Sequence, residues 1–221
     1  YQNTFAITTR MLGVMFAIHS DEKGFIIPPK IANNKIAIIP ILDDKNKKEV
    51  LKEAKKIFNE LKEFNPIFDD REEYRPGYKF NEYELKGIPI RIEIGKRDLD
   101  NSSAVLVRRD DGKKENIKLK NLKKNISDIL EDIQKNLLKK AEKLLKEAVV
   151  NADNFYELEK GIKNKKIVLV NLCNSVECEE NLKFKTGGAK VLNIDESKKA
   201  DGKCVMCSKK ADYVGRVGKS Y

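Results

Sequence analysis

The sequence predicts an α/β fold with a mixed sheet, followed by a small α+β segment that carries all of the cysteines. Between residues 35 and 149, short apolar runs alternate with longer stretches whose apolar residues recur at steps of three and four, the pattern of alternating strands and helices. The 4 cysteines lie between residues 173 and 207. Hydrophobic residues make up 40% of the 221 residues, which supports buried cores and excludes a wholly disordered chain.

The first elements follow from apolar runs of different lengths. Residues 10–19 (RMLGVMFAIH) form an apolar stretch that is either a buried strand or a helix, since periodicity does not decide between them. The isoleucine-rich run at 35–42 predicts a buried strand, and 66–69 predicts a second short one. Between them, apolar residues at helical spacing predict an amphipathic helix over 46–64.

The middle of the chain predicts a helix and three strands. Residues 77–86 are predicted as a short helix with Gly87 as its C-cap. The run IPIRIEI at 88–94 alternates between apolar and polar residues and predicts a strand. Residues 104–108 predict another, and a turn with the sequence Asp-Asp-Gly leads into a weak strand at 117–119.

A long amphipathic helix is predicted from about residue 122 to residue 149, because its leucines and isoleucines recur at steps of three and four. After Asn151 the composition changes. Residues 152–163 predict a short helix and 167–172 an apolar strand, which the cysteines follow directly.

The net charge is +10, from 45 Lys and Arg against 35 Asp and Glu. A basic chain of this kind is typical of polyanion binders such as nucleic-acid-binding proteins, and also of proteins from hot environments, whose surfaces are rich in Lys and Glu. No apolar run approaches the roughly 20 residues of a membrane span, and the start resembles no signal peptide. Because the first residue is Tyr1, we expect the chain to be the C-terminal part of a longer protein or a processed product.

The cysteines Cys173, Cys178, Cys204 and Cys207 are spaced C-x4-C and C-x2-C. Two such chelating pairs can close a tetrahedral zinc shell and let a small segment fold around the ion. The alternatives are two disulfides, unconnected buried cysteines or a thiol redox pair. No histidine lies nearby to suggest an open, catalytic site, so the spacing predicts structural zinc.

Two further residues stand out in the first segment. Arg10 lies at the edge of an apolar element, where it could form a buried ion pair or bind an anionic ligand. His19 is the only histidine of the chain and is interpreted as a structural residue.

Three further blocks of the sequence belong together: TTRMLGVMFAIHSDEKGFIIPPKIA at 8–32, GYKFNEYELKGIPIRIEIGKRDL at 77–99, and LCNSVECEENLKFKT at 172–186 with CVMCSKKA at 204–211. They resemble the prolyl-tRNA synthetase family of class II aminoacyl-tRNA synthetases, in the archaeal and eukaryotic type. The first block is similar to the third signature motif of that family, and the second to the core of its anticodon-binding domain. The third block resembles its zinc-bearing C-terminal segment.

The resemblance implies three parts: the end of a class II catalytic domain (1–32), an α/β anticodon-binding domain (33–121), and a connecting helix with a zinc-binding domain (122–221). It implies a reaction in two steps: proline and Mg²⁺-bound ATP give prolyl-adenylate and pyrophosphate, and the prolyl group is then transferred to tRNA(Pro). Arg10 would bind the ATP phosphates with Thr8 beside the nucleotide, since a fixed guanidinium stabilises charge that develops on phosphate oxygens. His19 and Ser20 would neighbour the proline pocket.

The resemblance also implies an anticodon site. Phe80 and Glu84 are four residues apart, so one helix face offers a stacking ring and an acceptor for guanine, which the proline anticodons share. The other implied residues are Arg91, Arg97, Asp98 and Lys113. The alternative is that Phe80 is core, that Glu84 pairs with a lysine and that the others are solvated.

The resemblance further implies a cytoplasmic homodimer with no membrane contact, in which the C-terminal Tyr221 reaches toward the catalytic site rather than fraying. Two other functions stay open at this point. One is a non-catalytic RNA-binding module with a structural zinc. The other is a generic basic zinc-ribbon protein that binds nucleic acid without selecting tRNA.

Overall fold

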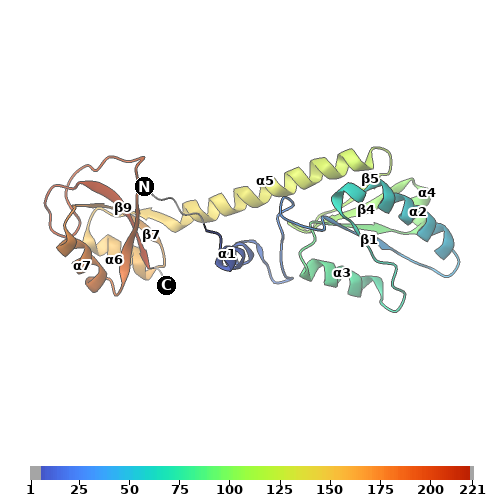
Figure 1. Ribbon diagram of the computed structural model, residues 1–221, viewed down its shortest axis with the longest axis horizontal. Helices are drawn as coiled ribbons and strands as arrows, with labels where there is room; N and C mark the ends of the chain where they lie inside the picture. Colours follow the sequence, from blue (N-terminus) through green and yellow to red (C-terminus); the bar gives the residue numbers. More distant parts are fainter. Residues whose placement is uncertain (1–5, 220–221) are drawn as a thin grey trace. The chain divides into compact units, whose positions relative to one another are not determined.

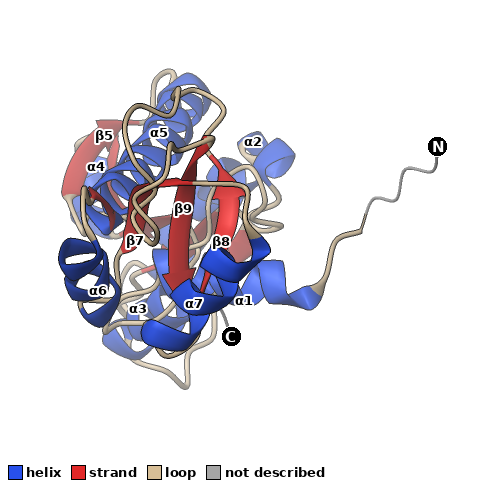
Figure 2. Ribbon diagram, turned by 90° about the vertical axis from the view of Figure 1, so that its left-hand side faces the viewer, coloured by secondary structure: helices blue, strands red, loops and turns tan. Residues whose placement is uncertain are grey.

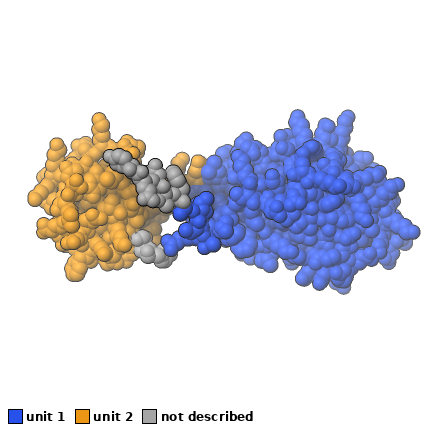
Figure 3. Space-filling view, viewed as in Figure 1, with its two compact units in different colours: residues 1–141 blue, residues 142–221 orange. Residues whose placement is uncertain are grey.

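The computed structural model describes residues 6–219, and the chain divides into two compact units between residues 141 and 142 (Figure 3). The elements of the first unit are, in order, α1 (Thr9–His19), β1 (Ile36–Pro40), α2 (Lys47–Glu60), the 3-10 helix η1 (Lys62–Phe64), β2 (Ile67–Phe68), α3 (Pro76–Leu85), β3 (Ile90–Ile94), α4 (Lys96–Asp100), β4 (Ser103–Arg108), β5 (Lys114–Lys118) and the first part of α5 (Leu122–Ala148).

The five strands of this unit form one mixed sheet in the order β2-β1-β3-β4-β5. β1 runs parallel to both β2 and β3, whereas β3, β4 and β5 are antiparallel. Every residue of β1 is buried, as expected for a parallel strand that is covered on both faces. The predicted α/β fold with a mixed sheet is therefore confirmed.

Helices cover the two faces of this sheet differently. α2 and α5 pack on one face, where Ile57, Ile126 and Ile133 contact the isoleucines of β1 and β3. α3 packs on the other face, where Tyr83 contacts Ala37 and Ile39. Figure 1 shows α5 and α3 on opposite sides of the strands. The β1–α2–β2 and β2–α3–β3 connections thus lie on opposite faces, as right-handed crossovers to either side of β1 require.

The apolar stretch before β1, left open between strand and helix, is the helix α1. It has no buried residue, and it exposes the apolar residues Met11, Leu12, Val14 and Ile18. The segment that follows α1 is tied to the end of α3 through two backbone hydrogen bonds, from Phe25 N to Leu85 O and from Ile27 N to Gly87 O.

Glycine is required at Gly24, where φ is +130° and an added Cβ would lie 2.6 Å from the Cα of Leu85. The predicted C-cap Gly87 also has a positive φ, of +73°, and follows the end of α3. These two glycines let the segment after α1 lie directly against the backbone at the end of the helix.

The predicted long helix is confirmed as α5, residues 122–148. Its first part belongs to the core of the first unit through Leu122, Ile126, Leu130, Ile133 and Leu137. Its last turns fall within the second unit. The expected division into parts 1–32, 33–121 and 122–221 describes functional segments and stays a prediction.

The second unit contains β6 (Val149–Asn151), α6 (Phe155–Lys163), β7 (Ile167–Leu172), α7 (Val176–Lys185), β8 (Ala189–Ile194) and β9 (Tyr213–Lys219). Its sheet has the order β6-β7-β9-β8, with β6 parallel to β7 and the other pairs antiparallel. Figure 2 shows β9 between β7 and β8. The core includes Leu158, Val168, Leu182 and Val217. Sequence patterns indicated α6 and β7 but not α7, β8 or β9.

No helix of residues 6–219 is both long and apolar enough to cross a membrane.

Candidate functional site

Three of the predicted anticodon residues form one contact cluster between α3 and β3. The guanidinium of Arg91 lies 4.3 Å from the centroid of the Phe80 ring. It also donates a hydrogen bond of 3.0 Å to Oε1 of Glu84, which lies one helical turn beyond Phe80. Phe80 and Glu84 are half-buried, whereas Arg91 is buried. The cluster therefore presents a ring and a carboxylate that one buried arginine holds in place.

Arg91 has a second carboxylate partner that sequence reasoning missed. Its Nε donates to Oε1 of Glu93 over 3.0 Å, and Nζ of Lys114 lies 3.6 Å from the same oxygen. Arg91, Val107 and Lys114 are in register across β3, β4 and β5, so their side chains share the sheet face on which α3 packs. The alternation in 88–94 was the only sequence signal that Arg91 and Glu93 share a face.

The remaining predicted RNA contacts lie just beyond the ends of strands of this sheet. Arg97 and Asp98 belong to α4, which begins directly after β3. Arg97 is exposed, whereas Oδ2 of Asp98 accepts a 2.8 Å hydrogen bond from the Gly95 backbone and so caps α4. Lys113 is exposed beside the turn that precedes β5, and its Nζ lies 3.3 Å from Asp111. Asp98 therefore has a structural role in addition to any contact with RNA.

A buried arginine that the sequence did not single out connects the segment after α1 to this cluster. Arg109 donates through Nη1 and Nη2 to both carboxylate oxygens of Asp21, over 2.8 and 2.6 Å. Its Nε donates to the backbone carbonyl of Glu84 over 2.9 Å. The hydrogen bonds from Arg109 lower the pKa of Asp21 to about 2, although partial burial opposes the charge. Arg109 thereby joins the helix of the predicted anticodon site to the chain segment next to Ser20.

The predicted nucleotide residues lie at the start of α1, and the predicted neighbours of the proline pocket lie at its end. Thr8 occupies the N-cap position, and Arg10 is exposed, which excludes the buried ion pair considered as its alternative. His19, at the last turn, is half-buried, and Ser20 is the C-cap residue. Burial and the nearby charge of Lys140 lower the pKa of His19, so the imidazole is neutral near pH 7.

All four cysteines meet in one cluster in the second unit. They are free thiols whose Sγ atoms lie within 4.8 Å of one another. Sγ of Cys173 is 3.5 Å from that of Cys178 and 3.6 Å from that of Cys207. Metal–sulfur bonds of about 2.3 Å in a tetrahedron place sulfur atoms about 3.8 Å apart. The four cysteines are thus arranged so that they could hold a metal ion.

The surroundings of the four cysteines shift the pKa values of their thiols. Cys173 follows β7, Cys178 lies in α7, and the other two belong to the loop before β9. Burial and the neighbouring thiols raise the pKa of Cys178, whereas backbone N–H groups, including that of Met206, lower the pKa of Cys204 to about 7 despite its burial. Four thiolates in so small a volume repel one another, so a cation would stabilise their deprotonated form.

Tyr221, the last predicted site residue, lies outside the described residues.

Comparison with known proteins matches both units. Residues 35–129 match the family model described as "Anticodon binding domain", and residues 155–221 match "Prolyl-tRNA synthetase, C-terminal". The first match covers the mixed sheet with the Phe80 cluster, and the second covers all four cysteines. Together, fold and site define the class as the tRNA-binding region of an aminoacyl-tRNA synthetase.

Curated relatives narrow this class. The chain is 36% identical to "Proline--tRNA ligase" of Ruminiclostridium cellulolyticum over 223 residues, which covers 100% of this chain and 46% of that protein. It is 40% identical to "Proline--tRNA ligase" of Mycoplasmopsis synoviae over 187 residues, which covers 85% of this chain and 39% of that protein. The chain thus spans less than half the length of these relatives. It belongs to the prolyl-tRNA synthetase family, as a C-terminal region.

Proposed function

We propose that this chain is the tRNA-binding C-terminal part of an enzyme that activates proline with ATP and Mg²⁺ and transfers it to tRNA(Pro). The observation that carries the proposal is the Phe80–Glu84–Arg91 cluster on the matched anticodon-binding domain. The relatives that match along the whole chain carry the name of this activity. In keeping with the family resemblance, we propose a cytoplasmic homodimer.

The cluster suits the recognition of guanines in an unpaired loop. Bases of a single-stranded loop are read by stacking on aromatic rings and by hydrogen bonds to their edges. The ring of Phe80 supplies stacking, and the carboxylate of Glu84 accepts hydrogen bonds from guanine N–H groups. Arg91 is buried and already paired with two carboxylates, so we assign it to holding Phe80 and Glu84. Arg97 and Lys113 are exposed and can reach RNA acceptors, while Asp98 keeps α4 in position.

Arg10 would bind the ATP phosphates during adenylate formation. The proline carboxylate attacks the α-phosphate, pyrophosphate leaves, and negative charge spreads over the phosphate oxygens. A guanidinium stays charged and offers several fixed donors to these oxygens. The exposure of Arg10 at the start of α1 leaves it accessible to such a ligand, with Thr8 beside it. His19 and Ser20, at the other end of α1, would border the proline pocket, and Tyr221 would approach the catalytic site.

The cysteine cluster would hold a structural zinc ion. Four sulfur ligands would fill its tetrahedral shell, which leaves no position for a substrate. The ion would connect the end of β7, α7 and the loop between β8 and β9 (residues 195–212), and so hold that loop in place. The role of the ion would be to stabilise the fold, because the segments that carry the ligands contain no long apolar run that could pack them together.

A binding experiment with tRNA tests the proposal. We expect Phe80→Ala and Glu84→Gln to weaken the binding of tRNA(Pro) by about 1–3 kcal/mol each, the value of one base contact. Changing the two anticodon guanines should weaken binding to the wild-type protein by a similar free energy. Glu84→Gln should not weaken the binding of this altered tRNA any further. The control is Glu159→Gln in the second unit, because Glu159 is an ion-paired glutamate as well, with Lys163 of its own helix as the partner. Full affinity of both variants for tRNA(Pro) would refute the proposed site.

A second experiment tests the catalytic part of the proposal in the longer protein. Arg10→Ala should abolish proline-dependent ATP–pyrophosphate exchange and leave tRNA binding intact. Exchange near the wild-type rate in this variant would refute the role of Arg10. A wild-type protein without exchange activity, but with selective binding of tRNA(Pro), would instead indicate the non-catalytic RNA-binding module.

A further inference from the structure

Two tyrosines of the first unit stack on each other at the surface. Tyr74 precedes α3 and Tyr78 lies in its first turn, with ring centroids 4.6 Å apart and ring planes inclined by only 13°. Tyr74 is 38% exposed and Tyr78 is 55% exposed, although each ring covers part of the other. Aromatic rings contribute most when they are covered, so an exposed stack of this kind is suited to another flat group.

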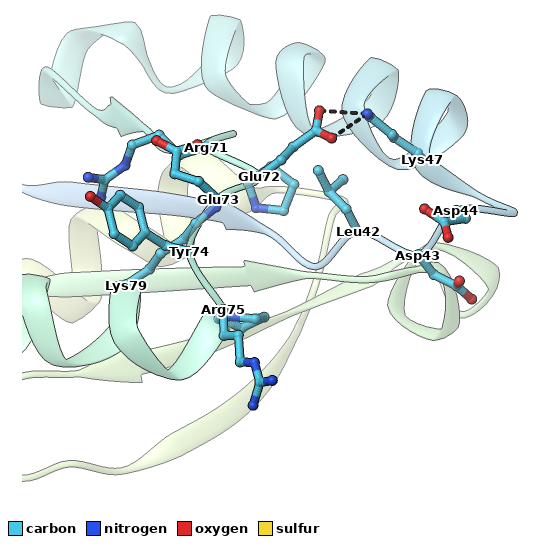
Figure 4. A pocket seen from close by; sticks show the side chains of 12 residues that line it. Leu42, Asp43, Asp44, Lys47, Arg71, Glu72, Glu73, Tyr74, Arg75 and Lys79 are labelled. Carbon is cyan, nitrogen blue, oxygen red and sulfur yellow. Dashed lines mark hydrogen bonds and ion pairs between the residues drawn. The ribbon is translucent and has the colours of Figure 1, made fainter.

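An arginine anchored on a buried carboxylate holds this stack in place before any ligand arrives. The guanidinium of Arg71 lies 4.8 Å from the centroid of the Tyr74 ring, and Figure 4 shows the two side chains next to each other. Arg71 donates to both carboxylate oxygens of Asp69, over 2.9 and 2.8 Å, and Asp69 is only 3% exposed. A surface that is already ordered loses little conformational entropy on binding.

The surroundings of Tyr78 favour an RNA ligand. Tyr78 and Asn81 line a hollow of about 570 Å³ together with Lys23. Lys23 and Arg75 are exposed, and neither has an ion-pair partner within residues 6–219, so both are available to phosphates. Asn81 lies three residues beyond Tyr78 and is exposed, so its amide can offer a donor and an acceptor to a base edge.

Acidic side chains near the hollow do not oppose such a ligand. Glu82 accepts hydrogen bonds from Arg71 and Lys86, both of 2.6 Å. Glu84 is paired with Arg91. Glu84 also borders the hollow, so the surface around Tyr78 is continuous with the cluster that contains Phe80.

We propose that Tyr74 and Tyr78 form a stacking platform for one unpaired RNA base, namely a loop base next to the two anticodon guanines of tRNA(Pro). The inference rests on the proposed function, because it adds a contact with one further base of the RNA that this domain is proposed to bind. Phe80 and Glu84 recognise the guanines, whereas the ring of Tyr78 binds their neighbour. Stacking tolerates any base, so the platform adds affinity and orientation more than sequence preference.

The test measures binding of an anticodon stem–loop of tRNA(Pro) to the full chain. Tyr78→Ala should weaken binding by about 5- to 150-fold, the range for loss of one stacked base, and Tyr78→Phe should stay within about twofold. Tyr156→Ala is the control, since Tyr156 is 72% exposed in the second unit and should leave binding unchanged. A 2-aminopurine at the loop positions beside the guanines should lose fluorescence on wild-type protein at one position, and keep it on Tyr78→Ala.

Two results would overturn the platform: affinity of Tyr78→Ala within twofold of wild type, or no fluorescence change with wild-type protein at any flanking position. The second result needs no variant, so it holds even if Tyr78→Ala folds poorly. Phe80→Ala separates the platform from the proposed function. If Phe80→Ala loses affinity and Tyr78→Ala does not, the platform is refuted and the anticodon site stands. If neither variant loses affinity, both are refuted.

Discussion

Replacing Asp69 by Asn should destabilise the first unit strongly while changing the shape of the side chain little. Asp69 follows β2, and its carboxylate accepts hydrogen bonds from Arg71 and, over 3.1 Å, from the hydroxyl of Tyr83. Nζ of Lys79 lies 3.5 Å from Oδ1 of Asp69, and the side chain of Lys79 is only 4% exposed. The substitution therefore leaves a buried ammonium group without its counter-charge.

The expected loss follows from the exposure of the two cations. Removal of one partner from a buried ion pair costs about 3–5 kcal/mol. The side chain of Arg71 is 36% exposed and can recover hydration, whereas that of Lys79 cannot. We therefore expect the lower end of this range, about 3 kcal/mol.

Hydrogen exchange of the strand amides is the assay. A loss of about 3 kcal/mol should speed exchange in β1 and β3 by about two orders of magnitude, and β7 of the second unit serves as the internal reference. The matched control is Asp70→Asn, because Asp70 is the exposed neighbour of Asp69. The double variant Asp69→Asn/Lys79→Met should recover part of the loss. Exchange in β1 and β3 at the wild-type rate in Asp69→Asn would refute this account of the network.

Three further outcomes follow from the same structure. Burial opposes the charge of Asp69, but the hydrogen bonds from Arg71 and the charge of Lys79 lower its pKa to about 2. The stabilisation of the fold by Asp69 should therefore be present above pH 4, be lost between about pH 4 and pH 2, and be missing in Asp69→Asn. Identical acid unfolding titrations of the two proteins would contradict this. Gly24→Ala should raise exchange at 25–27, because the new Cβ meets the backbone of Leu85, whereas Gly13→Ala meets nothing within 4 Å and should be neutral or stabilising; equal exchange in both would count against the tight contact. Cys178→Ser should lower the bound zinc from about one ion per chain and increase exchange at 204–211, with Ser175→Ala as the control; metal analysis that finds no zinc in the wild-type protein would exclude the metal centre.

Local patterns predicted most elements well, because the type of an element depends mainly on the spacing of its own apolar residues. The predicted helix 122–149 is observed at 122–148, and the strand expected at 35–42 is observed at 36–40. α7 was missed, because its apolar residues Val176 and Phe184 are exposed and give no stripe that could be recognised. β8 and β9 were missed as well, since glycines interrupt β9 and four of the six residues of β8 are exposed.

The candidate site was predictable only in part. The i, i+4 spacing placed Phe80 and Glu84 on one face of a helix, and the cysteine spacing indicated a metal centre. Nothing in the local sequence indicated that Arg109 would bind Asp21, which lies 88 positions earlier. Asp69 likewise gave no signal, because two of its partners, Lys79 and Tyr83, come from α3 and reach it only through the tertiary fold.

By itself, the sequence determined the order of strands and helices, the family resemblance and the grouping of the cysteines, all of which depend on residues near one another in the chain. Only the tertiary structure decided that Arg91 is buried between Glu84 and Glu93, that α1 exposes Arg10, and which arginines join distant segments. The physical reason is that strand register and helix packing bring these charges together, and both depend on contacts between residues far apart in the chain.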